Sequence, residues 1–153
     1  MTKDYALGHI QLVRGLLFKA LENVTEEQAK VIPTNFNNNI LWNVGHIYVS
    51  FEHIVLGSVG KAQKIDWADL FVPGSKPAEW TKEAPTLEEL KGLLQEQTSR
   101  VAEVLEGHLD DQAENPFKLG ELATFTTARE CISFSLFHEG LHVGTINNLK
   151  KLV

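Results

Sequence analysis

Four stretches of this sequence repeat apolar residues every three or four positions, the spacing that places side chains on one face of an α-helix. They cover about residues 3–24, 38–57, 86–107 and 127–153. In the first stretch the repeating residues are Leu7, Ile10, Val13, Leu17, Leu21 and Val24. No strand-like alternation separates the four stretches. The sequence therefore predicts an all-α fold, a four-helix bundle that forms one domain over residues 1–153.

Side chains able to cap helices stand at the expected helix starts. Three threonines are each followed three positions later by Glu or Gln, the pattern of a capping box, and the pairs are Thr25–Gln28, Thr86–Glu89 and Thr127–Glu130. The first pair opens a short turn that Pro33 ends, and the other two open the third and fourth helices. Asn38 or Asn39 is expected to cap the second helix. Residues 109–126, which contain turn-forming Asn-Pro and Gly, are expected to form an irregular connection.

A long crossover is predicted between the second and third helices, over residues 58–85. Regular structure is interrupted there by Pro73, Gly74, Pro77 and Pro85. Its large aromatic residues are expected to hold it against the helices, and these are Trp67, Phe71 and Trp80. Because a connection of this length often borders a functional site, we expect it to act as a lid.

Charge and composition exclude several classes of protein. The net charge of −6 argues against non-specific nucleic-acid binding, which needs Lys and Arg to displace phosphate counterions. No apolar run approaches the roughly 20 residues that span a bilayer, so no membrane partner is expected. The one cysteine, Cys131, cannot form an internal disulfide, and the first residues lack the apolar core of a secretion signal. We therefore expect a cytoplasmic protein.

Two histidines on the last helix have the spacing of a metal-binding pair. His138 and His142 lie one turn apart, so their side chains project from the same face at a separation that one ion can bridge. The residues within about 40° of His138 on that helix are Cys131, Phe134, Thr145, Leu149 and Leu152. This is the apolar stripe that faces the core. A buried imidazole needs a partner, and a shared cation satisfies both rings.

His46 is the best candidate for a third ligand. It lies on the inward face of the second helix, with Trp42 one turn before it and Val49 and Ser50 one turn after it. His53 lies on the same face, but about two turns or ~10 Å further along the axis, so only one of the two can meet the pair on the last helix. We expect His53 to be a core or rim residue.

Other interpretations of these residues stay open. The His138–His142 pair could form only a polar seam. His9 and His108 are expected to be exposed, and Cys131 is expected to fill the core. Glu139, about 100° around the helix from His138, is predicted as an acid/base or supporting group, with a solvated surface glutamate as the alternative.

The segment His138-Glu139-Gly140-Leu141-His142 also fits the H-E-x-x-H pattern of zinc peptidases. Those enzymes usually take a third ligand downstream of the second histidine. The eleven residues that follow His142 contain no His, Cys, Asp or Glu. A metallopeptidase is therefore the weaker interpretation.

Taken together, these residues resemble a known family. The most similar parts are Leu41-Trp42-Asn43-Val44-Gly45-His46, Thr127-Ala128-Arg129-Glu130 and His138-Glu139-Gly140-Leu141-His142-Val143-Gly144. They resemble the DinB-like proteins, also called the damage-inducible or YfiT-like superfamily of bacterial four-helix bundles. The resemblance covers nearly the whole chain. It implies metal ligation by His46, His138 and His142, a long crossover between helices two and three, and frequent dimerisation. The family pattern often continues with Gln where this chain has Thr145, so no role is carried over to that position.

The resemblance also implies a range of activities. Characterised relatives include metal-dependent transferases that use a low-molecular-weight thiol such as bacillithiol or mycothiol, and hydrolases or isomerases that act on thiol adducts. We expect one divalent metal ion, Zn, Ni or Fe, because imidazole ligands suit all three. The first hypothesis is a thiol-dependent transferase or related hydrolase with a small-molecule substrate, acting as a homodimer. The alternative is a non-catalytic metal-binding or stress-response bundle.

Overall fold

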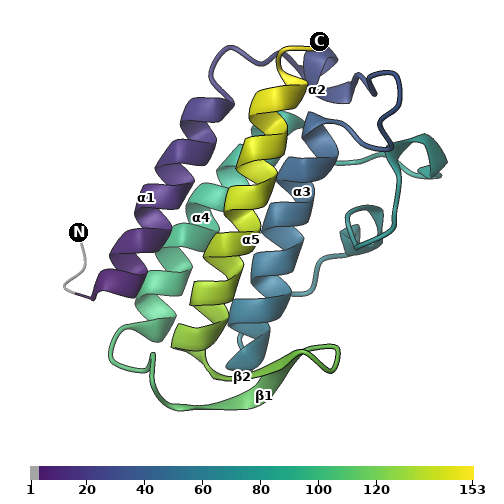
Figure 1. Cartoon of the computed structure of the whole chain (residues 1–153). Coiled ribbons are helices and arrows are strands. Elements are labelled where there is room, and N and C mark those ends of the chain that lie inside the picture. The colour runs from purple at the N-terminus through teal and green to yellow at the C-terminus, as the bar shows by residue number, and fades with distance from the viewer. Residues whose placement is uncertain (1–3) are drawn as a thin grey trace.

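The computed structural model describes residues 4–153, and it is mostly helical. Four long helices lie side by side in Figure 1, and their bounds are α1 Tyr5–Ala20, α3 Ile40–Phe51, α4 Leu87–Leu105 and α5 Ala128–Leu149. A short helix, α2 (Glu26–Lys30), follows α1. Helix α3 continues directly into η1 (Glu52–Leu56), a π-helical segment of a kind often found at functional sites. The four predicted helical stretches are therefore present.

The helix starts agree with the capping residues in the sequence. All three capping boxes form, with Thr25, Thr86 and Thr127 as the N-caps of α2, α4 and α5. Asn39 caps α3, because its Oδ1 accepts a hydrogen bond from the backbone N–H of Trp42 at 2.8 Å. These side chains satisfy backbone donors that the first turn of a helix leaves without partners.

A layer of polar side chains divides the core between the long helices. The apolar residues form two separate clusters, one that includes Leu17, Leu94 and Ile146 and another that includes Val13, Val101 and Leu136. Arg14, Gln97 and Glu139 each lie between members of the two clusters along their own helices. All three are buried, and none is more than 2% exposed.

Hydrogen bonds and ion pairs connect the polar layer across the helices. Nε of Arg14 lies 2.8 Å from Oε1 of Glu139, and Nη2 of Arg14 donates to Oε1 of Gln97 at 2.9 Å. Gln97 donates in turn to Oε2 of Glu52 at 2.8 Å, which also accepts from Nη2 of Arg100 at 2.8 Å. Two guanidinium groups therefore balance two carboxylates, which buried charges require.

The connection between α4 and α5 corrects the expectation of an all-α fold and an irregular loop. It contains an antiparallel hairpin, β1 (Gln112–Leu119) and β2 (Ala123–Thr127), in which Phe117 pairs with Phe125. The register shifts between Gln112 and Phe117, the part of β1 that contains Pro116. Proline has no N–H to donate to a ladder, so a strand that contains it pairs irregularly.

The long connection between η1 and α4 contains two short 3₁₀ helices, η2 (Ala68–Leu70) and η3 (Pro77–Glu79). Phe71 is fully buried, and its ring contacts those of Trp67 and Trp80 at centroid distances of 5.6 and 5.2 Å. The aromatic residues therefore hold the segment against the helices, as predicted.

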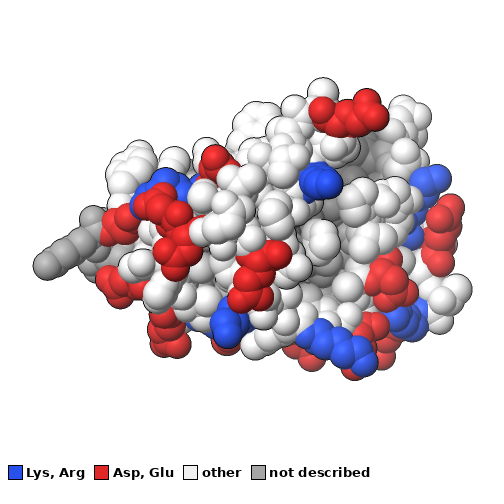
Figure 2. All heavy atoms as spheres, turned by 90° about the horizontal axis from the view of Figure 1, so that it is seen from below, with Lys and Arg blue, Asp and Glu red and all other residues white. Residues whose placement is uncertain are grey.

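The distribution of surface charge and the character of the helices bear on nucleic-acid and membrane binding. Seen from the hairpin end, acidic and basic side chains are intermixed, and the described part of this face has no continuous basic patch (Figure 2). Among the described helices, none combines the length and the apolar character that crossing a membrane requires.

The polar layer generates a prediction about stability. Replacing Arg14 with Met leaves the buried Glu139 carboxylate without its cation, and we expect a loss of roughly 3–5 kcal/mol in the free energy of unfolding. The double variant Arg14→Met/Glu139→Leu should regain most of that loss. Urea unfolding in the presence of a chelator measures both. Equal losses in the single and double variants would contradict the role given to the ion pair.

Candidate metal centre

Three histidines from two helices converge inside the protein. Nε2 of His138 lies 3.1 Å from Nε2 of His46 and 3.2 Å from Nε2 of His142. One nitrogen from each ring can be chosen so that all three lie within 4.8 Å of one another. His46 is buried on α3, and the other two are half-buried on α5. The structure thus brings together the three residues that the sequence selected.

The spacing of these nitrogens fits a common metal ion. Two imidazole nitrogens bound at ~2.0–2.1 Å, with an angle of about 100° between them, lie about 3.2 Å apart. The two observed Nε2 distances are 3.1 and 3.2 Å. A divalent ion could therefore contact all three rings with little rearrangement of the backbone.

Hydrogen bonds on the far side of two rings fix which nitrogen faces the centre. Nδ1 of His46 donates to the backbone carbonyl oxygen of Phe71 at 2.6 Å, since that oxygen can only accept. Nδ1 of His142 lies 2.7 Å from Oδ1 of Asn43. The amide nitrogen of Asn43 donates to the backbone oxygen of Asn39 at 2.8 Å, so Oδ1 is the atom that faces His142.

These contacts place a lone pair on Nε2 of both His46 and His142. Nε2 of His138 carries at most one proton, which can satisfy one of the two neighbouring lone pairs. The hydroxyl of Ser50, 3.3 Å from Nε2 of His46, can donate to the other, and a cation between the three nitrogens would bind all of them at once. Hydrogen bonding of the outer nitrogen to a carbonyl is also the arrangement that usually orients metal-binding histidines.

The segment around His46 supports its ring from two further sides. Trp42 stacks on the imidazole with a centroid distance of 4.6 Å and an interplanar angle of 10°. A Cβ added at Gly45 would overlap the ring of Phe71, so only glycine lets that residue approach α3. Because Phe71 supplies the carbonyl that binds Nδ1, the glycine contributes indirectly to the orientation of His46.

Burial keeps the three rings neutral. Burial, together with the smaller effect of the neighbouring histidines, lowers the pKa of His138 to about 4 and that of His142 to about 3. Burial also lowers the pKa of His46, although the hydrogen bond to Phe71 opposes this. Neutral imidazoles are the form that binds a metal.

One residue in contact with the centre also lines a cavity. Ser50, one turn after His46, places Oγ 3.3 Å from Nε2 of that histidine. Ser50 also lines a cavity of about 520 Å³ between η1, the long connection and β1. The sequence predicts that Ser50 lies on the inward face of the helix, but nothing in the sequence assigns it a part in the site.

Glu139 lies in the polar layer, away from the group of three histidines. Its side chain is 2% exposed and contacts Arg14, so the alternative of a solvated surface glutamate is wrong. Burial raises the pKa of the Glu139 carboxyl, and the guanidinium of Arg14 opposes that rise. Among the described residues, the metal-binding group found contains the three histidines and no carboxylate.

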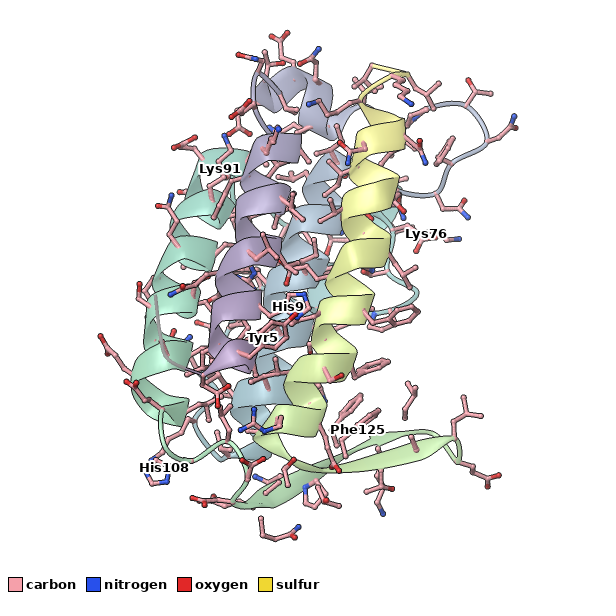
Figure 3. The ribbon with its side chains drawn as sticks, turned by 60° about the vertical axis from the view of Figure 1, so that its left-hand side comes forward. Tyr5, His9, Lys76, Lys91, His108 and Phe125 are labelled. Carbon is pink, nitrogen blue, oxygen red and sulfur yellow. The ribbon has the colours of Figure 1, made fainter. Side chains whose placement is uncertain are left out.

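The remaining histidines do not join this group. His53 is exposed at the rim of the cavity and makes an edge contact with Phe117 at a centroid distance of 6.1 Å. His9, which is partly exposed, lies beside Tyr5 on α1, and His108 follows the end of α4 (Figure 3). The prediction that His53 is not a ligand agrees with this geometry. Cys131 is fully buried, as expected of a core residue.

Comparison with known proteins gives a family. The model of the DinB superfamily matches residues 9–146, and the chain therefore belongs to that superfamily. None of the curated proteins compared with the chain matches it.

The hydrogen bond from His142 to Asn43 predicts an effect on metal affinity. Asn43→Ala removes the acceptor, and we expect Zn²⁺ affinity to fall roughly 10- to 100-fold, the usual effect of losing such a partner. Asn43→Asp retains an acceptor oxygen and should retain tight binding. Competition titration against a chelating dye measures both. Asn147→Ala, at an exposed position of α5, is the control, and an equal loss there would contradict the assignment.

The lowered histidine pKa values predict a pH dependence for the metal-free protein. Unfolded histidines titrate near 6.5, whereas His138 in the folded chain titrates at about 4 and His142 at about 3. As pH falls from about 6.5 to 4, the unfolded state binds protons that the folded state excludes, so the free energy of unfolding decreases. Urea unfolding at several pH values across this range measures how steeply the free energy of unfolding changes with pH. His142→Asn should reduce this slope, and an unchanged slope would contradict the prediction.

Proposed function

We propose that this member of the DinB superfamily holds one divalent metal ion between His46, His138 and His142 and uses it in a transferase or hydrolase reaction of a small molecule. The observation that carries the proposal is the convergence of three neutral imidazoles, two of which have a hydrogen-bonded outer nitrogen. Zn, Ni and Fe all suit this ligand set.

The proposed reaction joins a thiol to an electrophile. A carbon–sulfur bond forms while the bond to the leaving group breaks, and the leaving group departs with the electron pair. The thiol proton passes to solvent. A divalent ion with open positions lowers the pKa of a thiol or a water that reaches it, so hydrolysis is the related alternative.

The protein's own residues have separate parts in this proposal. The three histidines supply neutral donors, and Asn43 and the carbonyl of Phe71 orient two of them. The acid/base role predicted for Glu139 stays a prediction. Its contact with Arg14 favours a positioning role, in which the ion pair fixes the part of α5 that carries His138.

The cavity beside Ser50 favours an enzyme over a non-catalytic metal protein. A metal that only sustains the fold needs no access for a substrate, whereas here Ser50 both contacts His46 and lines a cavity of about 520 Å³. The peptidase interpretation needs the Glu139 carboxylate to act beside the metal, and the contact with Arg14 does not support that.

The homodimer and the cytoplasmic location stay predictions. Exposed apolar side chains on α1 and α5 offer surface that a second copy could cover, and they are Leu12, Leu16, Phe137 and Leu141.

Metal content and activity test the proposal together. Protein purified without a histidine tag should contain about one metal ion per chain by elemental analysis, and His46→Ala should lose most of it, because two ligands rarely hold an ion tightly. With monochlorobimane as the electrophile and a panel of low-molecular-weight thiols, adduct fluorescence should require the metal. Chelation should abolish it, and added metal should restore it.

Two results would overturn the proposal. One is a metal content that is unchanged in His46→Ala. The other is adduct formation that continues at the same rate after complete removal of the metal. His9→Ala, a histidine outside the group of three, is the matched control and should retain both metal and activity.

A further inference from the structure

The cavity beside Ser50 has walls from three parts of the chain. Val49 and Ile54 come from α3 and η1, Ile65 and Val72 come from the long connection, and Phe117 comes from β1. Its volume of about 520 Å³ lies within the range of sites that take small organic molecules. All five of these side chains are apolar.

The one carboxylate in the wall is already occupied. Oε1 of Glu52 accepts from the backbone N–H of Gln63 at 2.7 Å, and Oε2 accepts from Gln97 and Arg100. Glu52 is also 2% exposed. It therefore offers little charge to an occupant, and the cavity does not favour a strongly cationic ligand.

Two sets of contacts connect this cavity to the three histidines. Oγ of Ser50 lies 3.3 Å from Nε2 of His46, the nitrogen that faces the centre. Val72 directly follows Phe71, whose carbonyl binds the other nitrogen of the same ring. Ser50 therefore lies between the cavity and Nε2 of His46, and none of the three histidines is part of the cavity wall.

An aromatic stack makes the second connection. Phe117 stacks on Phe134 of α5 at a centroid distance of 5.9 Å, and Phe134 stacks on the ring of His138 at 6.3 Å. Phe125, which lies on the hairpin below α5 in Figure 3, stacks on both phenylalanines. The apolar wall thus extends from the cavity to a second ligand.

We propose that the substrate is amphipathic, with an apolar organic body that fills this cavity and a polar reactive head that reaches the three histidines. This inference rests on the proposed function, because it places the head at the metal. In the transfer reaction, the occupant of the cavity is the electrophile. Low-molecular-weight thiols are mostly polar and gain little from these walls.

A series of n-alkanehydroxamic acids separates the two parts of the proposal. The hydroxamate head binds a divalent metal, so acetohydroxamate reports on the metal alone, and longer chains report on the cavity. In calorimetric titration of the zinc-loaded protein, we expect affinity to rise about threefold to fourfold per added CH₂ up to octanohydroxamate, as burial of apolar surface requires.

A matched pair of variants tests whether the rise in affinity with chain length comes from the cavity. Val72→Asp places a charge in the cavity wall and should remove most of the dependence on chain length while acetohydroxamate still binds. Val31→Asp is the control, because Val31 is similarly exposed, at 44% against 40%, and does not line the cavity. It should leave the whole series unchanged.

The outcomes distinguish an error in the proposed role of the cavity from an error in the proposed metal site. If acetohydroxamate binds and longer chains bind no more tightly, the cavity proposal is overturned and the metal centre stands. If no metal binds, 1-octanol is titrated into the metal-free protein and followed by NMR. Shifts in the signals of Ala68 and Val72 would then support an apolar occupant, and their absence would overturn it.

Discussion

The site depends on two hydrogen bonds that turn imidazole rings toward one point. The carbonyl of Phe71 holds Nδ1 of His46, and Oδ1 of Asn43 holds Nδ1 of His142. Without these acceptors, either ring could rotate or exchange tautomers, and its second nitrogen would no longer be available to a metal. Burial then keeps the rings neutral, because a charged imidazole is disfavoured away from water. Convergence, orientation and neutrality are together what would allow one buried and two half-buried histidines to share a metal ion.

Helix α5 serves the site on one side and the polar layer on the other. His138 and His142 face α3, whereas Glu139 contacts Arg14 of α1. A buried ion pair contributes little net stability compared with apolar packing, but breaking it is costly. The pair also restricts how α5 can be rotated relative to α1, because Glu139 must keep its contact with Arg14. Since the histidines lie on the same helix, this rotation also determines whether they reach His46.

The sequence predicted the parts of this arrangement that helix geometry determines. The spacing of His138 and His142 places them on one face in any α-helix, and the position of His46 on an apolar face predicted its inward direction. The hydrogen bond to the carbonyl of Phe71 could not be predicted, because every residue has a backbone oxygen and the sequence does not mark which one lies near His46. Glu139 was ambiguous, since its partner Arg14 is distant in sequence. The hairpin was missed because Asn115 and Pro116 interrupt the alternation in β1 that indicates a strand.

The long connection links the orientation of the metal ligand to the proposed cavity. Phe71 supplies the carbonyl for His46, and the next residue, Val72, lines the cavity. Phe71 can pack this closely only because Gly45 has no side chain. Consecutive residues of one segment thus orient a histidine of the centre and line the cavity, so both depend on how this segment packs against α3.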